Sequence, residues 1–91
     1  MSCIFCKIIA GELPCDKVYE DEFTLAFLDI KPANPGHTLV APKKHVVNFE
    51  DTDEKTLCHV IKTVKQVGFS LKKNLDAPGY NVTENNDPAA G

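Results

Sequence analysis

Apolar residues recur along this chain at two different spacings, which predict helices in some segments and strands in others. Near the start, four apolar residues lie about one helical turn apart, and Gly11 and Pro14 follow them. These residues are Ile4, Phe5, Ile8 and Ile9. The spacing predicts a short helix that ends at Gly11, because glycine and proline interrupt a helix.

A mostly apolar run at residues 23–30 predicts a strand. Side chains of a strand alternate between its faces, so every second residue shares a face. One face carries Phe23, Leu25, Phe27 and Asp29. Asp29 therefore ends an apolar row, where it either caps the next turn or reaches a ligand. Two prolines and a glycine at residues 31–36 predict a turn, and residues 37–41 predict a return strand that ends at Pro42.

The longest amphipathic segment is residues 53–74, where acidic residues at the start favour a helix N-terminus. Its apolar stripe consists of Leu57, Val60, Ile61, Val64, Val67, Gly68, Leu71 and Leu75. Lys72 and Lys73 suit the C-terminal end. Phe69 lies off the stripe, and an exposed phenylalanine at that position indicates a subunit contact.

Residues 80–84 follow Pro78 and Gly79 and are predicted to form another strand, and residues 85–91 read as a loop. A strand in this position would have an unpaired edge, which is unfavourable. The pattern therefore predicts a single domain over residues 1–91 that is incomplete at its C-terminus.

Composition narrows the functional classes. The chain has 91 residues, 43% of them apolar, which suits one small domain. Its formal net charge of −3 argues against nucleic-acid binding, which needs a basic surface, but a mononucleotide remains compatible. No apolar run approaches the ~20 residues of a membrane span.

Four cysteines and three histidines are the candidate metal-binding or reactive residues. No cationic leader precedes an apolar run at the start, so we expect an intracellular, cytoplasmic chain with reduced thiols. Cys3 and Cys6 have the spacing of half a zinc site, and imidazole is the usual companion of two thiolates. Burial as small apolar residues and a redox pair are the alternatives.

The three histidines are expected to have different roles. His59 falls opposite the apolar stripe and is predicted to be a solvated surface residue. His37 opens a strand, where a structural role or a supporting role near a reactive group is expected. His45 follows Lys43 and Lys44, a pair expected to be solvated, and it binds metal only if the fold brings it to the cysteines.

Five segments, taken in order, resemble the N-terminal part of the histidine triad (HIT) family. They are residues 3–9 (Cys-Ile-Phe-Cys-Lys-Ile-Ile), 18–21, 26–30, 35–40 (Pro-Gly-His-Thr-Leu-Val) and 42–45. The ordered set is specific, although each piece alone is weak. The resemblance implies a HIT-like α+β fold, with an antiparallel sheet, one short and one long helix, and the last strand missing.

The resemblance also implies functional roles. Zinc would be held by Cys3, Cys6, His45 and a histidine outside these residues. Asp29 would accept hydrogen bonds from ribose hydroxyls. The residues implied to line a purine pocket are Ile4, Phe5, Ile8, Phe27 and Ile30, while Asn85 and Gly91 are implied to lie near the phosphates.

Family chemistry is hydrolysis or transfer at the α-phosphate of nucleotide conjugates, through a histidine nucleophile. Its His-x-His-x-His segment would follow Gly91 and does not occur in these residues, while His37 matches only a supporting position. The resemblance therefore implies a homodimeric purine nucleotide hydrolase or transferase when full length, and a chain without turnover as given. A non-catalytic nucleotide-binding module and a structural zinc or interaction module are the alternatives.

Overall fold

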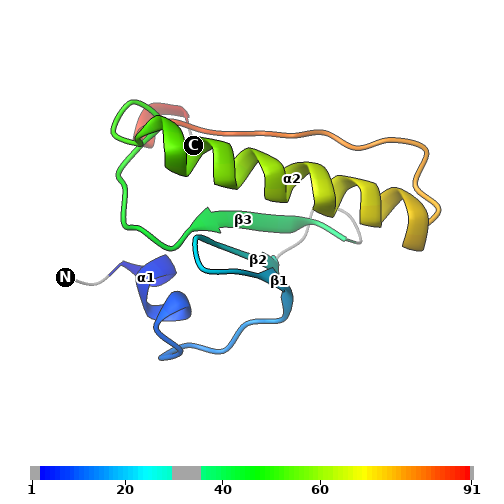
Figure 1. The fold of residues 1–91 in the computed structure, drawn as a ribbon, viewed down its shortest axis with the longest axis horizontal. Helices are drawn as coiled ribbons and strands as arrows, with labels where there is room; N and C mark the ends of the chain where they lie inside the picture. Colours follow the sequence, from blue (N-terminus) through cyan, green and yellow to red (C-terminus); the bar gives the residue numbers. More distant parts are fainter. Residues whose placement is uncertain (1–2, 30–35, 91) are drawn as a thin grey trace.

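The computed structural model describes residues 3–29 and 36–90, which form helices on both sides of one antiparallel sheet. The elements in chain order are α1 (Ile4–Ile9), β1 (Lys17–Glu20), β2 (Thr24–Leu28), β3 (Thr38–Pro42), α2 (Glu54–Asn74) and the 3-10 turn η1 (Pro88–Ala90). Figure 1 shows α2 along one side of the sheet and α1 on the other. The predicted α+β class, with one short and one long helix, is confirmed.

The strand β2 is the centre of the sheet, in the order β1-β2-β3 with antiparallel pairing throughout. Its residues 24–27 are at most 4% exposed. Burial runs through consecutive residues because elements cover both faces of this central strand. Leu25 and Phe27 then share one face, and Thr24 and Ala26 share the other.

The helix α2 begins as predicted, because the side chain of Asp53 accepts a hydrogen bond from the backbone N–H of Thr56. Its buried residues are Thr63, Val67 and Gly68. Two members of the predicted stripe are exposed instead, Ile61 (61%) and Leu75 (51%). Ile61 lies about 200° around the helix from Thr63. Leu75 lies beyond the end of a helix that is about 30 Å long, whereas the strands span roughly 17 Å.

The pattern of apolar and polar residues did not predict the edge strand β1. All four of its residues are exposed, so it lacks the alternation of apolar and polar residues that marks a half-buried strand. Lys17 and Lys43 each contact the carboxylate of Glu20 at 2.8 Å, which lowers the pKa of Glu20 to about 2. The Lys43–Glu20 pair therefore joins β1 to the residue that follows β3, whereas the Lys17–Glu20 pair lies within β1.

The predicted strand at residues 80–84 is wrong. This segment has no strand pairing and runs back alongside α2 toward its N-terminal end (Figure 1). The ring of Tyr80 lies on Gly68, where an added Cβ would be 2.6 Å from Cε2 of Tyr80. The side chain of Asn86 accepts a hydrogen bond from the N–H of Phe49 at 2.8 Å. A strand needs a neighbour for its hydrogen bonds, and no strand of the described part of the chain lies beside this segment.

Gly36 ends the predicted turn, whose residues 31–35 lie outside the described residues. It adopts a φ of 85°, which glycine tolerates because it has no Cβ. A Cβ at this position would lie 2.6 Å from Cδ1 of Leu75. The positive φ therefore favours glycine here, and the side chain of Leu75, the residue after α2, packs close against it.

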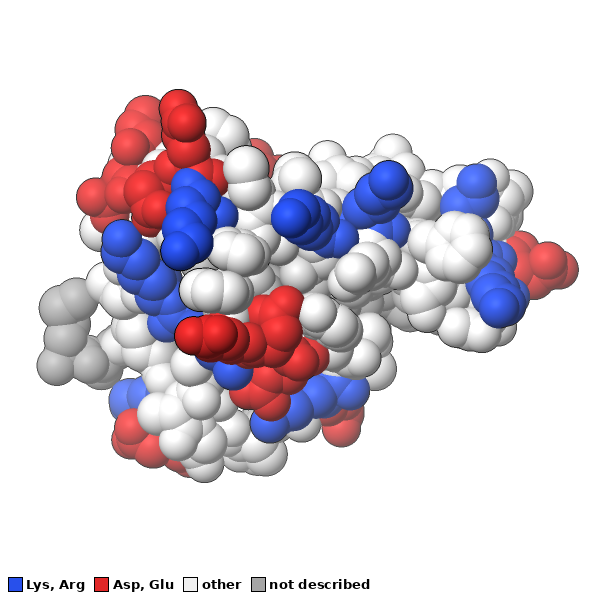
Figure 2. Space-filling view, in the orientation of Figure 1, with Lys and Arg blue, Asp and Glu red and all other residues white. Residues whose placement is uncertain are grey.

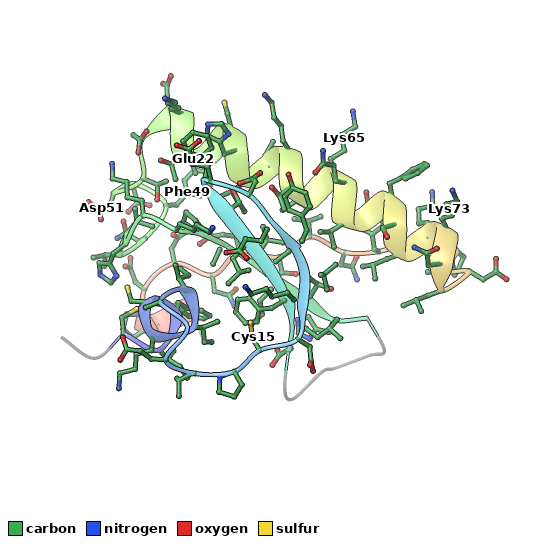
Figure 3. All side chains as sticks on the ribbon, turned by 60° about the horizontal axis from the view of Figure 1, so that its bottom comes forward. Cys15, Glu22, Phe49, Asp51, Lys65 and Lys73 are labelled. Carbon is green, nitrogen blue, oxygen red and sulfur yellow. The ribbon has the colours of Figure 1, made fainter. Side chains whose placement is uncertain are left out.

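Charged side chains are unevenly distributed over the surface. In Figure 2 lysines follow the length of α2, while acidic side chains gather at the end of the molecule where α2 begins. Figure 3 shows Lys65 and Lys73 extending from α2 away from the sheet. No helix in residues 3–29 or 36–90 combines the length and hydrophobicity needed to cross a membrane.

Candidate functional site

The start of α1 and the loop after β3 bring two thiols and one imidazole together. Cys3 is the N-cap of α1, and Cys6 lies in its first turn. The Sγ atom of Cys6 is 3.1 Å from Nδ1 of His45. One ligand atom from each of Cys3, Cys6 and His45 lies within 4.8 Å of the other two. Among the described residues, these three side chains form a group that could hold a metal ion.

The two thiols differ in acidity because of their places at the helix start. The backbone N–H of Cys6, followed by its thiol, donates to the sulfur of Cys3 and lowers the pKa of Cys3 to about 7. The pKa of Cys6 is raised, chiefly by its hydrogen bond to Cys3. Cys3 is therefore the first thiol to ionise, and the thiolate is the form that binds metal.

The donor set fits a zinc ion. Tetrahedral zinc takes thiolate sulfur at about 2.3 Å and imidazole nitrogen at about 2.0 Å, so its ligand atoms are roughly 3.3–3.8 Å apart. The three ligand atoms here lie within 4.8 Å of one another, and one pair is already at 3.1 Å. Small side-chain movements would close the group around an ion, with one coordination position left for a fourth ligand.

A second group of predicted site residues lies where α1 faces β2. The rings of Phe5 and Phe27 have centroids 6.3 Å apart and are inclined at 48°. Phe27 is buried, whereas Phe5 is 43% exposed and Ile4 57% exposed. Ile8 is half-buried on the same helix. This arrangement leaves an accessible apolar surface beside α1, next to the face of β2 that carries Phe27.

An acid and an imidazole continue that face of the sheet. Asp29 follows β2, and its N–H donates to the carbonyl oxygen of His37 at 2.9 Å. Nδ1 of His37 lies 3.6 Å from Oδ2 of Asp29. Asp29 shares its face with Phe27 because residues two apart in a strand point the same way. The structure thus places a carboxylate at the end of the apolar row, as the sequence predicts.

Asn85, which is implied to lie near the phosphates, is not placed with this group. Asn85 is exposed in the segment after α2, next to Asn86, which bonds to Phe49 before α2. In Figure 1 this part of the chain is near the start of α2, whereas β2 ends at the opposite end of the sheet. Ile30 and Gly91 lie outside the described residues.

His59 is not the solvated residue predicted. Its ring stacks on Phe23 with centroids 3.9 Å apart and 10° between the planes. The stack borders an open hollow of about 310 Å³ that is also lined by Lys43, Lys44 and Asp53. Phe23 lies in the turn before β2 and His59 lies in α2, far apart in the chain, so no local pattern could have revealed this contact.

Lys43 and Lys44 are paired with carboxylates. Lys43 contacts Glu20 at 2.8 Å, and Lys44 contacts Asp53 at 3.1 Å. Their charges are therefore offset locally by these two carboxylates.

Fold and site together define a small α+β domain with a thiol–imidazole cluster at one end and an apolar surface with an acidic end. The HIT domain pattern matches residues 10–91. The chain belongs to the histidine triad (HIT) family.

Similar proteins extend over almost the whole chain. An uncharacterized HIT-like protein of Methanocaldococcus jannaschii is 56% identical over 89 residues, which are 98% of this chain and 68% of that protein. The adenosine 5′-monophosphoramidase of Schizosaccharomyces pombe is 42% identical over 94% of this chain and 62% of its own length.

Solved structures agree with this assignment. The crystal structure of a Zn-bound histidine triad family protein from Mycobacterium smegmatis is 40% identical, with a TM-score of 0.94 over 99% of this chain and 66% of that chain. The present chain therefore spans about two thirds of the length of these relatives.

Proposed function

We propose that this chain binds a purine nucleotide or nucleotide conjugate, and that in a full-length HIT protein it serves hydrolysis or transfer at the α-phosphate. The proposal is carried by the apolar surface that Phe5 of α1 forms with Phe27 of β2. Asp29 follows β2 and ends the row of side chains that contains Phe27. An aromatic surface suits a purine base, and a carboxylate accepts hydrogen bonds from the two hydroxyls of ribose. The phosphoramidase relative acts on an adenosine 5′-monophosphate compound, which supports this substrate class.

The same proposal includes a structural zinc ion. Cys3, Cys6 and His45 would hold it, and the Zn-bound relative from Mycobacterium smegmatis supports this choice of metal. Zinc at this position would tie α1 to the loop after β3, and α1 carries Phe5. The metal would therefore hold one side of the nucleotide surface in place without taking part in the chemistry.

Calorimetry with AMP tests nucleotide binding. We expect saturable binding by the zinc-loaded chain and a loss of about tenfold or more in affinity for Asp29→Ala, since hydrogen bonds to a charged acceptor are lost. Asp16→Ala is the matched control, because Asp16 is an exposed acid whose carbonyl oxygen bonds to the N–H of Leu28 near the same end of the sheet. Equal losses in both variants would refute a specific role for Asp29.

The three histidines of the chain form no His-x-His-x-His segment, so we expect AMP binding without turnover of an adenosine phosphoramidate. Clear saturable turnover by the pure chain would contradict this. A folded, zinc-loaded chain that ignores nucleotides would instead favour the second candidate function, a structural zinc or interaction module. The cluster of Cys3, Cys6 and His45 is the observation that favours that candidate.

We also propose that two copies associate through the outer face of α2. Phe69 and Ile61 are 68% and 61% exposed there, and large exposed apolar side chains mark contact surfaces. The thiols of all four cysteines are free, which suits the reducing cytoplasm as the location of this dimer.

Light scattering after gel filtration tests the dimer. Phe69→Glu is expected to give a monomer at concentrations where the parent chain is a dimer, because a buried charge without a partner is costly. Val47→Glu is the control, since Val47 is 76% exposed on the loop before α2. If Phe69→Glu leaves the mass unchanged, α2 is not the contact surface.

A further inference from the structure

Cys3 and Cys6 are close enough to form a bond with each other as well as with a metal ion. Their Sγ atoms lie within 4.8 Å of one another and of a ring nitrogen of His45. A disulfide brings two sulfur atoms to about 2.05 Å, so the two side chains need only turn toward each other. Both cysteines are free and half-buried, so small solutes in the solvent can reach their sulfur atoms.

The start of the chain can accommodate this movement. Cys3 precedes α1 with an extended backbone (φ −90°, ψ 122°), so its side chain is not fixed by helical geometry. No residue of α1 is buried, whereas the core lies on β2 and α2. Segments with few buried side chains rearrange at a small free-energy cost. A disulfide between residues three apart would therefore change the first turn of α1 and leave the core intact.

We propose that Cys3 and Cys6 are a site of reversible thiol–disulfide exchange with low-molecular-weight disulfides, and that this disulfide and the zinc ion exclude each other. Exchange by the zinc-free chain is independent of the proposed zinc site, whereas the mutual exclusion rests on it. The disulfide uses both sulfurs, which leaves His45 as the remaining ligand of the cluster at a site where zinc takes four. Bound zinc in turn holds both thiolates, which are the attacking species in the exchange.

The exchange has two steps, here with oxidised glutathione as the disulfide. The thiolate of one cysteine attacks a sulfur of oxidised glutathione, which forms a mixed disulfide and expels one glutathione thiolate. The thiolate of the other cysteine attacks the protein sulfur of the mixed disulfide, which closes the Cys3–Cys6 bond and expels the second glutathione thiolate. The protons lost by the protein thiols end on the two released glutathione molecules. The protein loses two electrons, and oxidised glutathione gains them.

This exchange links the redox state of the surroundings to the attachment of α1. Formation of the disulfide removes the ion that would tie α1 to the loop after β3, where His45 lies. An excess of reduced thiols runs the exchange in the opposite direction and makes both sulfurs available to zinc again. The site therefore holds zinc in a reducing compartment and releases it under oxidation.

A variant that keeps only Cys3 and Cys6 identifies the bond. Cys15→Ser combined with Cys58→Ser leaves these two thiols, because the chain has four cysteines. The zinc-free double variant is incubated with excess oxidised glutathione, and intact mass spectrometry identifies the product. We expect the loss of two hydrogen atoms and no retained glutathione. Adding Cys6→Ser gives the matched control, which should retain one glutathione on Cys3, because no second thiol is present to resolve the mixed disulfide.

The zinc-loaded form of the same double variant tests the exclusion. Its oxidation is expected to be at least about tenfold slower than that of the zinc-free form, because thiolates bound to the metal are not available for attack. A zinc-sensitive dye should report the release of about one ion for each disulfide formed, since the thiolates are the ligands that the disulfide removes. Excess reduced glutathione should then restore both thiols and zinc binding.

The outcomes separate the two parts of the proposal. Two retained glutathione molecules, or unreacted thiols, in the zinc-free double variant would overturn the exchange site. Equal oxidation rates with and without zinc, or zinc retained by the oxidised chain, would overturn the exclusion. If the chain binds no zinc at all, the proposed zinc site fails and the exclusion fails with it. The zinc-free measurement still decides whether Cys3 and Cys6 exchange.

Discussion

Cys6→Ser is expected to abolish stoichiometric zinc binding. The parent chain, purified with zinc, should carry about one ion per molecule, and loss of a thiolate ligand should weaken binding by at least about a hundredfold, since even changes to outer-shell partners cost 10–100-fold. The Sγ atom of Cys6 lies 3.1 Å from Nδ1 of His45, so Cys6 is the link between the pair of thiols and the imidazole. Mass spectrometry of the metal content measures the effect.

Cys15→Ser is the matched control for this change. Cys15 is a half-buried free cysteine outside the cluster, on the segment between α1 and β1 (Figure 3), and its replacement should leave the zinc content unchanged. A chelator should lower the melting temperature of the parent chain to that of Cys6→Ser. The chelated parent chain and the variant would both lack the zinc ion that links α1 to the loop after β3. Full zinc content in Cys6→Ser would show that the cluster is not a metal site.

Leu25→Ala is expected to have the largest effect on stability. Leu25 is 1% exposed in the central strand β2, and truncation of a buried leucine costs about 2–5 kcal/mol. Small domains have total free energies of unfolding of about 5–15 kcal/mol, so this substitution removes a large share of the stability. Urea denaturation followed by circular dichroism measures the change.

Leu28→Ala provides the comparison within the same strand. Leu28 is 39% exposed, so fewer of its contacts are lost, and we expect a cost of about 1 kcal/mol or less. Equal costs at the two positions would mean that the core does not lie on β2.

Much of the fold was predictable because its main elements carry strong local patterns. The long amphipathic segment with Asp53 at its start became α2, and the apolar run at 23–30 contains β2. Local patterns failed where both faces of an element are exposed, as in β1, or where the sequence favours extended structure but no neighbouring strand is present, as at residues 80–84. Pairing is a tertiary property, so propensity alone could not decide either case.

Some features of the candidate site were likewise predictable from the sequence, and others were not. The spacing of Cys3 and Cys6 and the apolar row that ends at Asp29 are local features, and the sequence by itself determined them because helical and strand periodicities fix which side chains share a face. Only the tertiary structure decided that His45 meets the thiols and that His37 faces Asp29. The physical reason is that these contacts join residues from different elements, and their distances follow from how the strands pair and how α1 packs on the sheet.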